Sequence, residues 1–298
     1  MIKPECNVLL TGATGFVGKR FVEYNRGSIQ VNTLSFQEWE NNETDVFKNV
    51  DTVVHLAGIA HRMEKTDPDL YFSINYQKTS VFADVAKKMG VKHFIFISTI
   101  KAFGEHQNGV LNEDSPTVPI NDPYGESKLK AEEYLKSIED DHFIVSIIRP
   151  PLIYGPGVKG NLIKFLDLAN KPVPLPFRHV SNRRTMIFLD NFIELINTIV
   201  ERKKSGKYLA GDAHPISTEY LISEIRKNLQ KPPLLFKMPS IIINILGKFK
   251  PELIMRLFGS LEMDVSNSYK RLGFKPPFTT EYGIKQMVDW YQKNKKNS

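Results

Sequence analysis

Tyr124 and Lys128 are the pair of side chains in this sequence best suited to acid–base chemistry. Because they are four residues apart, they share one face of a helix. A phenol with a pKa of about 10 transfers protons poorly at neutral pH, and a neighbouring ammonium lowers that pKa by stabilising the phenolate. Thr99, which ends an apolar run twenty-five residues before Tyr124, could hydrogen-bond a substrate oxygen. We predict that these three residues are catalytic.

The spacing of this pair is not distinctive by itself, because Tyr291 and Lys295 repeat it near the C-terminus. The second pair lies in a basic segment that no strand-end hydroxyl precedes. A glycine turn, a strand-end hydroxyl and then tyrosine and lysine at a helix start distinguish the first pair. The alternative for Tyr124 and Lys128 is an ordinary surface pair.

A glycine-rich turn near the N-terminus predicts a site for a dinucleotide. The apolar run Asn7–Leu10 leads into TGATGFVG (11–18) and then into an amphipathic stretch. A strand that breaks at glycine and continues as a helix presents free N–H groups and a positive dipole end to a pyrophosphate. Gly12 permits the tight turn, Gly15 lets the phosphates approach, and Gly18 lets helix and strand pack closely. A plain strand-to-helix turn is the alternative.

The segment after the second predicted strand bears on the choice between NAD and NADP. An acidic residue there binds the ribose 2′-hydroxyl of NAD. The segment 31–37 contains neither a carboxylate nor an arginine, whereas Lys19 and Arg20 follow the glycine turn. The cofactor is therefore NAD(P), and these residues favour NADP.

Apolar runs alternate with amphipathic stretches through the first half of the chain. This alternation is typical of strands buried on both faces of a parallel sheet and joined by helices, so we predict a doubly wound α/β fold. Between the first predicted helix and Thr52 there is room only for a weak strand at about 29–34 and a short helix around 44–49. The predicted strands are 7–10, 52–56, 94–97 and 144–148, and the predicted helices include 76–89 and 127–138.

The second half of the chain predicts a smaller lobe that binds the substrate. Prolines and glycines crowd residues 150–160 and 171–176, and helices are predicted at 190–203 and 218–229. We assign residues 1–155 to a dinucleotide-binding domain, with about 181–212 returning to it, and 156–298 largely to a mixed C-terminal lobe. The apolar and basic segment 241–258 is either a membrane-surface helix or, as we favour, a lid or packing helix of that lobe.

Composition excludes several other classes of protein. A single cysteine, Cys6, rules out a disulfide scaffold and a cysteine-based metal cluster, and we predict no metal site. The net charge of +7 is spread along the chain, so we expect no nucleic-acid partner. No apolar run reaches the roughly 20 residues of a membrane span, and the N-terminus lacks a signal-peptide core, so we expect a cytoplasmic protein.

Taken together, these motifs resemble the extended short-chain dehydrogenase/reductase family, which contains NAD-dependent nucleotide-sugar epimerases, dehydratases and reductases. TGATGFVG (11–18) resembles its glycine fingerprint, and TVVHLAG (52–58) resembles the motif beside the adenine. Thr99, Tyr124 and Lys128 fall on its catalytic Ser/Thr, Tyr and Lys. The resemblance implies a Rossmann sheet, a nucleotide-sugar substrate and, from the fold alone, a homodimer.

The resemblance also implies binding residues. Asn75 matches an asparagine that braces the active-site strand, and Arg183 aligns with an arginine that grips the diphosphate. Lys101 and Arg256 are further candidates for contacts with phosphate. The implied cofactor contacts are Gly12, Thr14, Gly15, Phe16, Val17, Gly18, Leu56, Ala57, Gly58, Asn75, Ser98, Tyr124, Lys128 and Pro150. The implied substrate contacts are Thr99, Lys101, Pro151, Asn161, Arg183 and Arg256.

Four phrases are most similar to one bacterial branch of the family: STIKAFGE (98–105), RPPLIYGPGVKGN (149–161), NRRT (182–185) and GSLEMD (259–264). That branch reduces UDP-4-keto-6-deoxy-N-acetylhexosamines to precursors of lipopolysaccharide or capsule. The resemblance implies an NAD(P)H-dependent 4-keto reductase. The alternatives are a UDP-sugar 4-epimerase with tightly bound NAD and a non-catalytic dinucleotide-binding relative. Epimerases usually carry an asparagine where this chain has Pro150 and Pro151, which favours the reductase.

Overall fold

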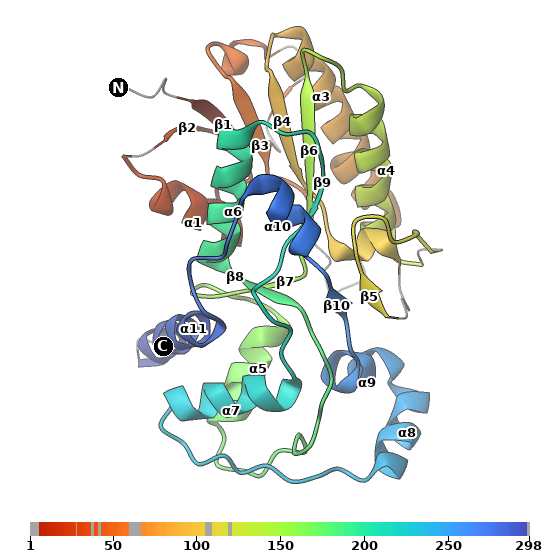
Figure 1. Ribbon diagram of the computed structural model, residues 1–298, viewed down its shortest axis with the longest axis vertical. Helices are drawn as coiled ribbons and strands as arrows, with labels where there is room; N and C mark the ends of the chain where they lie inside the picture. Colours follow the sequence, from red (N-terminus) through yellow and green to blue (C-terminus); the bar gives the residue numbers. More distant parts are fainter. Residues whose placement is uncertain are drawn as a thin grey trace.

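The computed structural model describes residues 6–27, 29–36, 39–40, 43–59, 67–104, 109–118 and 121–296. Gln37 and Glu105, which belong to segments discussed above, lie outside these ranges. The centre of the fold is a six-stranded sheet in the order β2-β1-β3-β4-β6-β9 (Figure 1). All its neighbouring strands are parallel, which confirms the predicted α/β class. The strands are β1 Asn7–Thr11, β2 Gln30–Leu34, β3 Thr52–His55, β4 His93–Ile97, β6 Ile144–Arg149 and β9 Gly206–Leu209.

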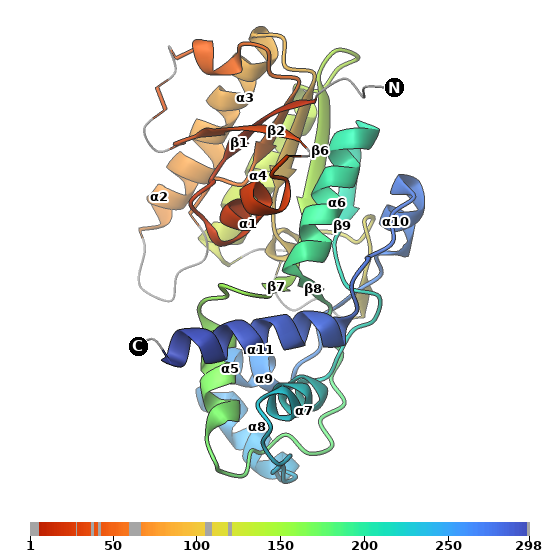
Figure 2. The same ribbon diagram turned by 90° about the vertical axis from the view of Figure 1, so that its left-hand side faces the viewer.

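Helices cover both faces of the sheet, which is why its strands are apolar throughout. On one face α1 (Phe16–Tyr24) and α6 (Leu189–Arg202) pack over side chains such as Val8 and Leu10. On the other face, α3 (Thr79–Lys88) and α4 (Pro123–Ser137) pack over Leu9 and Val53 (Figures 1 and 2). Alternate residues of one strand therefore enter two separate cores.

Strand β2 is the edge of the sheet. This confirms the prediction that only one strand fits between the first helix and Thr52. Between β2 and β3, the one regular element among the described residues is a 3₁₀ turn, Asp45–Phe47, where a short helix was expected. Phe36, Trp39 and Phe47 are almost fully buried against Phe82 of α3. Their rings fill the space beside β2, so the chain closes the core without a further strand.

The helix predicted at 76–89 has a different start. Its first turns are part of a π-helix, Phe72–Lys78, which follows the short α2 (Pro68–Tyr71) and precedes α3. The wider π turn shifts the face that each residue presents, and such stretches frequently mark functional sites. Asn75, a predicted binding residue, lies inside this stretch.

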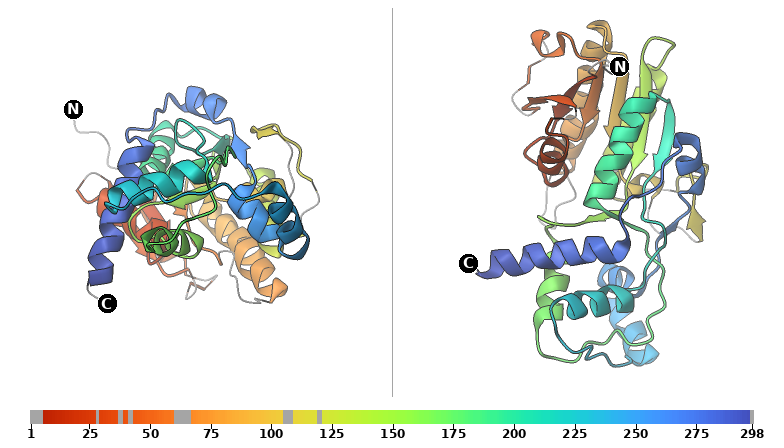
Figure 3. Two further views of the ribbon diagram at one scale, coloured as in Figure 1. Left: turned by 90° about the horizontal axis from the view of Figure 1, so that it is seen from below. Right: turned by 60° about the vertical axis from the view of Figure 1, so that its left-hand side comes forward.

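The C-terminal lobe has its own apolar core, to which Phe177, Ile222 and Met287 contribute. Helix α11 (Thr280–Lys296) crosses between the sheet and this lobe (Figures 2 and 3). The other elements of the lobe and its connections are β5 Val110–Leu111, β7 Leu152–Tyr154, α5 Asn161–Asn170, β8 Met186–Phe188, α7 Thr218–Asn228, α8 Ser240–Phe249, α9 Pro251–Phe258, β10 Glu262–Met263 and α10 Ser266–Leu272.

The chain returns to the sheet after its first passage through the lobe. Helix α6 covers one face and β9 pairs with β6, while Leu272 of α10 joins the same core. We therefore propose a cofactor-binding domain of residues 1–155 and about 181–212, with α10 packed on it, and a substrate lobe built from the rest of 156–298.

The segment predicted as one helix at 241–258 is two helices, α8 and α9, because Pro251 begins the second one. Helix α8 contains no buried residue, whereas Leu257 and Phe258 at the end of α9 pack against the core of the lobe. Across the described ranges, no helix combines the length and the apolar composition that crossing a membrane requires.

Candidate active site

The glycine turn lies where β1 ends and α1 begins, directly beside the end of β3. Gly12 has a φ of +75°, and a Cβ at this residue would lie 2.7 Å from the backbone nitrogen of Ala57. A Cβ on Gly18 would lie 2.1 Å from the carbonyl oxygen of Gly12. Both glycines are therefore required by sterics.

This turn has the features of a dinucleotide cradle. Thr14 and Gly15 are exposed at the N-terminus of α1, Phe16 and Val17 are half-buried, and Gly58 is exposed after β3. The free N–H groups of the first helical turn can bind a pyrophosphate that lies close to the backbone, because no side chain intervenes. The residues present thus fit an NAD(P) molecule whose phosphates lie over the turn.

Buried hydroxyls and a histidine hold the ends of β1 and β3 together. His55 Nδ1 is 2.9 Å from the Thr11 hydroxyl, and Nε2 is 3.0 Å from the Thr79 hydroxyl. The Thr11 hydroxyl also accepts a hydrogen bond from the N–H of Ala57 at 3.2 Å. Burial, aided by the charge of Lys128, keeps the pKa of His55 well below its usual value, so the ring stays neutral. Sequence analysis missed His55, although it lies within TVVHLAG.

Asn75 is completely buried and connects the loop after β3 to helix α4. Its Oδ1 accepts a hydrogen bond from the N–H of Ile59 at 2.8 Å, and its Nδ2 donates to the Ile59 carbonyl at 3.1 Å and to the Ser127 hydroxyl at 3.2 Å. The resemblance implied a brace for the active-site strand. The structure shows instead a brace between the segment that follows Gly58 and the helix that carries Tyr124.

Thr99, Tyr124 and Lys128 come together above the end of β4. The hydroxyls of Thr99 and Tyr124 are hydrogen-bonded to each other. Lys128 Nζ donates to the carbonyl of Ile97 at 3.0 Å, and a Cβ on Gly58 would lie 3.1 Å from that nitrogen. The ammonium is therefore next to the glycine that follows β3, on the side of the predicted cofactor.

Burial shifts the pKa values of both Tyr124 and Lys128. It raises the pKa of Tyr124 to about 12, against the lowering effect of the hydrogen bond from Thr99. It lowers the pKa of Lys128 to about 8, although Glu132 opposes the shift. The Lys128 ammonium lies 3.0 Å from the Ile97 carbonyl and 4.5 Å from the centroid of the Phe96 ring. Tyr124 is therefore a protonated phenol at neutral pH.

A buried ion pair joins helix α4 to strand β6. Arg149 Nη2 is 2.6 Å from Glu132 Oε2, and its Nε is 2.9 Å from Oε1. The hydroxyl of Ser98 donates to the same carboxylate. The side chain of Ser98, a predicted cofactor contact, is therefore committed to Glu132. Its N–H donates to the Ile148 carbonyl at 2.8 Å.

Two more predicted residues have structural partners. Lys101 Nζ is 2.5 Å from Oδ2 of Asp122, whose Oδ1 accepts from the N–H of Tyr124 at 3.3 Å as the N-cap of α4. Lys101 thus fixes the start of the catalytic helix and is not a merely solvated lysine. Pro150 and Pro151 are buried, and the Pro150 carbonyl accepts from the N–H of Ile100 at 3.0 Å, which joins β6 to the loop after Thr99.

The basic residues beside the glycine turn are placed differently from the prediction. Arg20 makes two hydrogen bonds to Asp190 of α6, at 2.7 and 2.9 Å, so its charge is compensated inside the protein. Lys19 is exposed. At the end of β2, the Lys78 ammonium lies 5.3 Å from the centroid of the Phe36 ring. Among the described residues, Lys78 thus brings a cation to the end of β2, which linear spacing could not reveal.

The arginines predicted to bind the substrate have different surroundings. The side chain of Arg183 is 59% exposed and is paired with Glu262 at 2.5 Å, while Asn161 is exposed at the first turn of α5. Arg184 is half-buried and donates to the Gly259 carbonyl at 3.0 Å. Arg184 also donates to the carbonyl of Met255 at 3.3 Å, next to Arg256, and its pKa is lowered by burial and by the charge of Arg256. We propose Arg184 and Arg256 as the diphosphate contacts.

We expect Arg184→Gln to raise the KM for a diphosphate-containing substrate by about tenfold or more, because a charge-assisted contact is lost. Arg183→Gln is the matched control, since it removes the neighbouring arginine that is already paired on the surface. Steady-state kinetics of both variants check this expectation. A larger rise in KM for Arg183→Gln would restore the assignment made from sequence.

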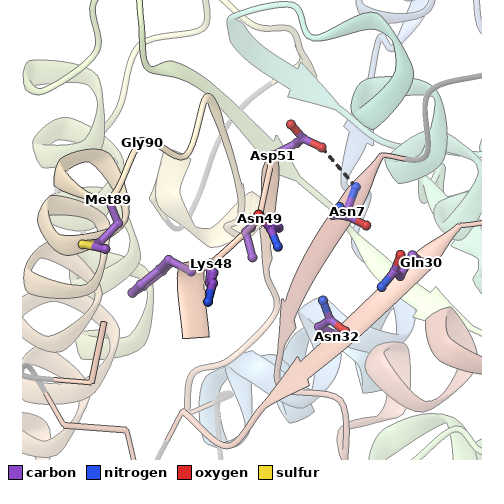
Figure 4. A pocket seen from close by; sticks show the side chains of 10 residues that line it. Asn7, Gln30, Asn32, Lys48, Asn49, Asp51, Met89 and Gly90 are labelled. Atoms are coloured by element: carbon purple, nitrogen blue, oxygen red, sulfur yellow. Dashed lines mark hydrogen bonds between the residues drawn. The ribbon is translucent and has the colours of Figure 1, made fainter. Parts of the chain in front are cut away.

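A cavity of about 690 Å³ lies elsewhere in the sheet domain (Figure 4). Asn7, Gln30 and Asp51 line it where their strands begin, and Asp51 accepts a hydrogen bond from the N–H of Asn7 at 3.2 Å. Ligands of doubly wound sheets bind at the carboxyl ends of the strands, whereas this cavity is at the amino ends. It is therefore separate from the site of Tyr124.

Comparisons with known proteins agree with this geometry. A UDP-glucose 4-epimerase from Vibrio cholerae is 34% identical over 312 residues, which cover 94% of this chain and 94% of that protein. A UDP-2-acetamido-2,6-beta-L-arabino-hexul-4-ose reductase from Pseudomonas aeruginosa is 26% identical over 207 residues, which cover 67% of this chain and 50% of the reductase. The structure of RMD from Pseudomonas aeruginosa complexed with NADPH has the same fold, with a TM-score of 0.77, 18% identity and coverage of 97% and 98%.

The family assignment follows from the extent of these matches. The sequence model of the NAD dependent epimerase/dehydratase family matches residues 8–211, which include the glycine turn and the three predicted catalytic residues. The match thus covers more than half of the chain. The chain belongs to the NAD dependent epimerase/dehydratase family.

Proposed function

We propose that this chain is an NAD(P)H-dependent 4-keto reductase that acts on a UDP-4-keto-6-deoxy-N-acetylhexosamine. The observation that carries the proposal is the end of β2. The strand stops at Leu34 at the edge of the sheet and continues into Ser35 and Phe36, without a carboxylate for the ribose. A dinucleotide held without that contact exchanges more readily, as a reductase requires in every turnover.

The chain's residues have defined tasks in this reaction. The bound reduced dinucleotide supplies a hydride for the carbonyl carbon. The Thr99 hydroxyl hydrogen-bonds the carbonyl oxygen and orients it toward Tyr124. Tyr124 donates its proton to that oxygen as negative charge develops, and its raised pKa keeps the proton in place beforehand. Lys128, beside Gly58, contributes a positive charge that stabilises the resulting phenolate.

The choice of NADPH over NADH is part of this proposal. The Lys78 ammonium is near Phe36 at the end of β2, where a 2′-phosphate would lie, and a carboxylate that would repel this phosphate is missing from residues 31–36. The related fold of RMD contains NADPH, which is compatible with this choice.

A UDP-sugar 4-epimerase is the second candidate, favoured by the 34% identity to a UDP-glucose 4-epimerase along 94% of the chain. It would use Thr99, Tyr124 and Lys128 first to remove and then to return a proton. The 26% identity to a hexul-4-ose reductase supports the reductase.

Retention of the cofactor distinguishes the two candidates. The purified protein is denatured, and the nucleotides that it releases are separated and quantified. We expect little bound NAD and, in titrations that follow tryptophan quenching, reversible binding of NADPH. Stoichiometric NAD that survives gel filtration would contradict the reductase and favour the epimerase.

The pH dependence of kcat/KM follows from Lys128. Its pKa of about 8 lies below the ordinary value for lysine, so the ammonium is present below that pH and is lost above it. Since kcat/KM reports the free enzyme, we expect a plateau on the acidic side of pH 8 and a decline on the alkaline side. Lys128→Arg keeps its charge through this range, so its remaining activity should lack the decline. An unchanged decline in that variant would assign it to another group.

A further inference from the structure

Helix α8 presents a continuous apolar face to solvent. Ile241, Ile245 and Phe249, at positions i, i+4 and i+8, are 66%, 50% and 79% exposed. Residues at this spacing lie on one side of a helix, and Ile242 and Leu246 widen the same stripe. An apolar patch of this size on a water-soluble surface indicates a binding partner.

The helix pair is fixed in this orientation by its other side. Ile243 and Gly247 of α8 are half-buried, and a Cβ on Gly247 would lie 3.9 Å from a methyl group of Ile254 on α9. Leu257 and Phe258 at the end of α9 pack against the core of the lobe, with the Phe258 ring 5.7 Å from that of Phe177. The pair of helices is therefore anchored to the lobe through α9, and the apolar stripe of α8 stays exposed.

Basic residues surround this stripe. Between Glu224 and Glu262 the chain has a single acidic residue, Glu252, and it forms an ion pair with Arg256 at 3.0 Å. Lys248 and Lys250 are exposed beside Phe249. Lys237, which precedes α8, is also exposed, so three exposed lysines lie on or beside this helix.

The segment that leads into α8 also combines exposed apolar side chains with an exposed lysine. Leu234 and Phe236 are 40% and 44% exposed, and Lys237 follows them. Helix α8 lies at the end of the molecule away from the sheet (Figures 1 and 2). Apolar and basic groups therefore share one end of the substrate lobe.

We propose that this end of the lobe binds the surface of an anionic membrane, with α8 lying in the plane of the lipid headgroups. A helix that combines a large apolar face with lysines inserts that face below the headgroups and places its charges against anionic lipid. Complementary charge favours lipid over a second copy of the chain, because a second copy would bring the same basic residues to the contact. Such binding is peripheral and is compatible with helices too short to span a bilayer.

Flotation of the full-length protein with vesicles tests this proposal. One set of vesicles contains phosphatidylcholine alone, and the other contains phosphatidylcholine and phosphatidylglycerol in equal parts. We expect the protein to float with the anionic set, to remain behind with the neutral set, and to dissociate as salt screens the charges. No flotation with anionic vesicles at low salt would overturn the proposal.

Two variants with matched controls separate the apolar and the charge contributions. Ile245→Asp with Phe249→Asp should weaken vesicle binding by about tenfold or more, because charge replaces the inserted face. Met89→Asp, at a residue that is 42% exposed on the sheet domain, should leave it unchanged. Lys248→Glu with Lys250→Glu should also abolish flotation, whereas Lys285→Glu with Lys293→Glu on α11 makes the same charge change and should not.

The same proteins are examined by sedimentation velocity, and their reductase activity is measured in solution. Normal activity in the α8 variants shows that they are folded, and it separates this proposal from the proposed reaction. One outcome would assign the stripe to self-association and overturn the proposal. In that outcome the unmodified protein is a dimer that does not bind vesicles, and the variant Ile245→Asp with Phe249→Asp is a monomer. Equal loss of flotation in the α11 control would attribute binding to net charge and likewise overturn it.

Discussion

Tyr124→Phe is expected to lower kcat by about a hundredfold to ten-thousandfold, the usual contribution of a positioned proton donor. The substitution removes only the hydroxyl that is hydrogen-bonded to Thr99 and retains the ring at the start of α4. The reduced substrate then has to take its proton from water. Turnover, measured as loss of NADPH absorbance, reports this effect directly.

Tyr71→Phe is the matched control, because the centroids of the Tyr71 and Tyr124 rings are 6.1 Å apart. It removes the same atom from the neighbouring ring and should change kcat by no more than a few-fold. NADPH should quench the fluorescence of both variants as it does for the unmodified protein, since the glycine turn is intact. Comparable kcat values for Tyr124→Phe and the unmodified protein would exclude Tyr124 as the proton donor.

Arg149→Leu is expected to destabilise the protein by about 3–5 kcal/mol, since it leaves a buried carboxylate without its counter-charge. Arg149 is 1% exposed, and its guanidinium carbon lies 4.1 Å from the centroid of the Phe103 ring. Glu132 would keep only the hydrogen bond from Ser98, in an environment where an unpaired charge is costly. The midpoint of urea unfolding measures the loss.

The double variant Arg149→Leu with Glu132→Leu should recover a large part of that stability, because no charge remains buried. Arg183→Leu is the matched control: its partner Glu262 stays near solvent, so the unfolding midpoint should change little. A double variant no more stable than Arg149→Leu would show that packing around Arg149, and not the unpaired charge of Glu132, causes the loss.

Local patterns predicted most strands of the sheet and the closeness of Tyr124 and Lys128. The apolar runs identify β1, β3, β4 and β6, because a parallel strand covered on both faces must be apolar throughout. Tyr124 and Lys128 are close together because four residues make about one helical turn. Gly12 and Gly18 were identifiable because their backbone contacts exclude a Cβ. In each case the cause lies within a few consecutive residues.

Contacts between distant segments could not be predicted in the same way. His55 joins β1 to α3, and Lys78 approaches Phe36 from a helix that follows the next strand. Arg183 and Arg184 are neighbours whose side chains have opposite environments, and sequence alone did not indicate which of them is near Arg256. The exposure of α8 depends on which of its faces the other helices of the lobe cover, and these helices are distant in the sequence.

The most direct test of the proposed function is turnover with a UDP-4-keto-6-deoxy-N-acetylhexosamine made enzymatically immediately before use. NADPH or NADH is added to the purified protein, absorbance of the reduced cofactor is followed, and the product sugar is identified. The account predicts oxidation of one NADPH for each 4-hydroxy sugar formed, with slower oxidation of NADH and none in Tyr124→Phe. Unchanged NADPH together with interconversion of UDP-sugars at C4 would contradict it and identify the protein as an epimerase.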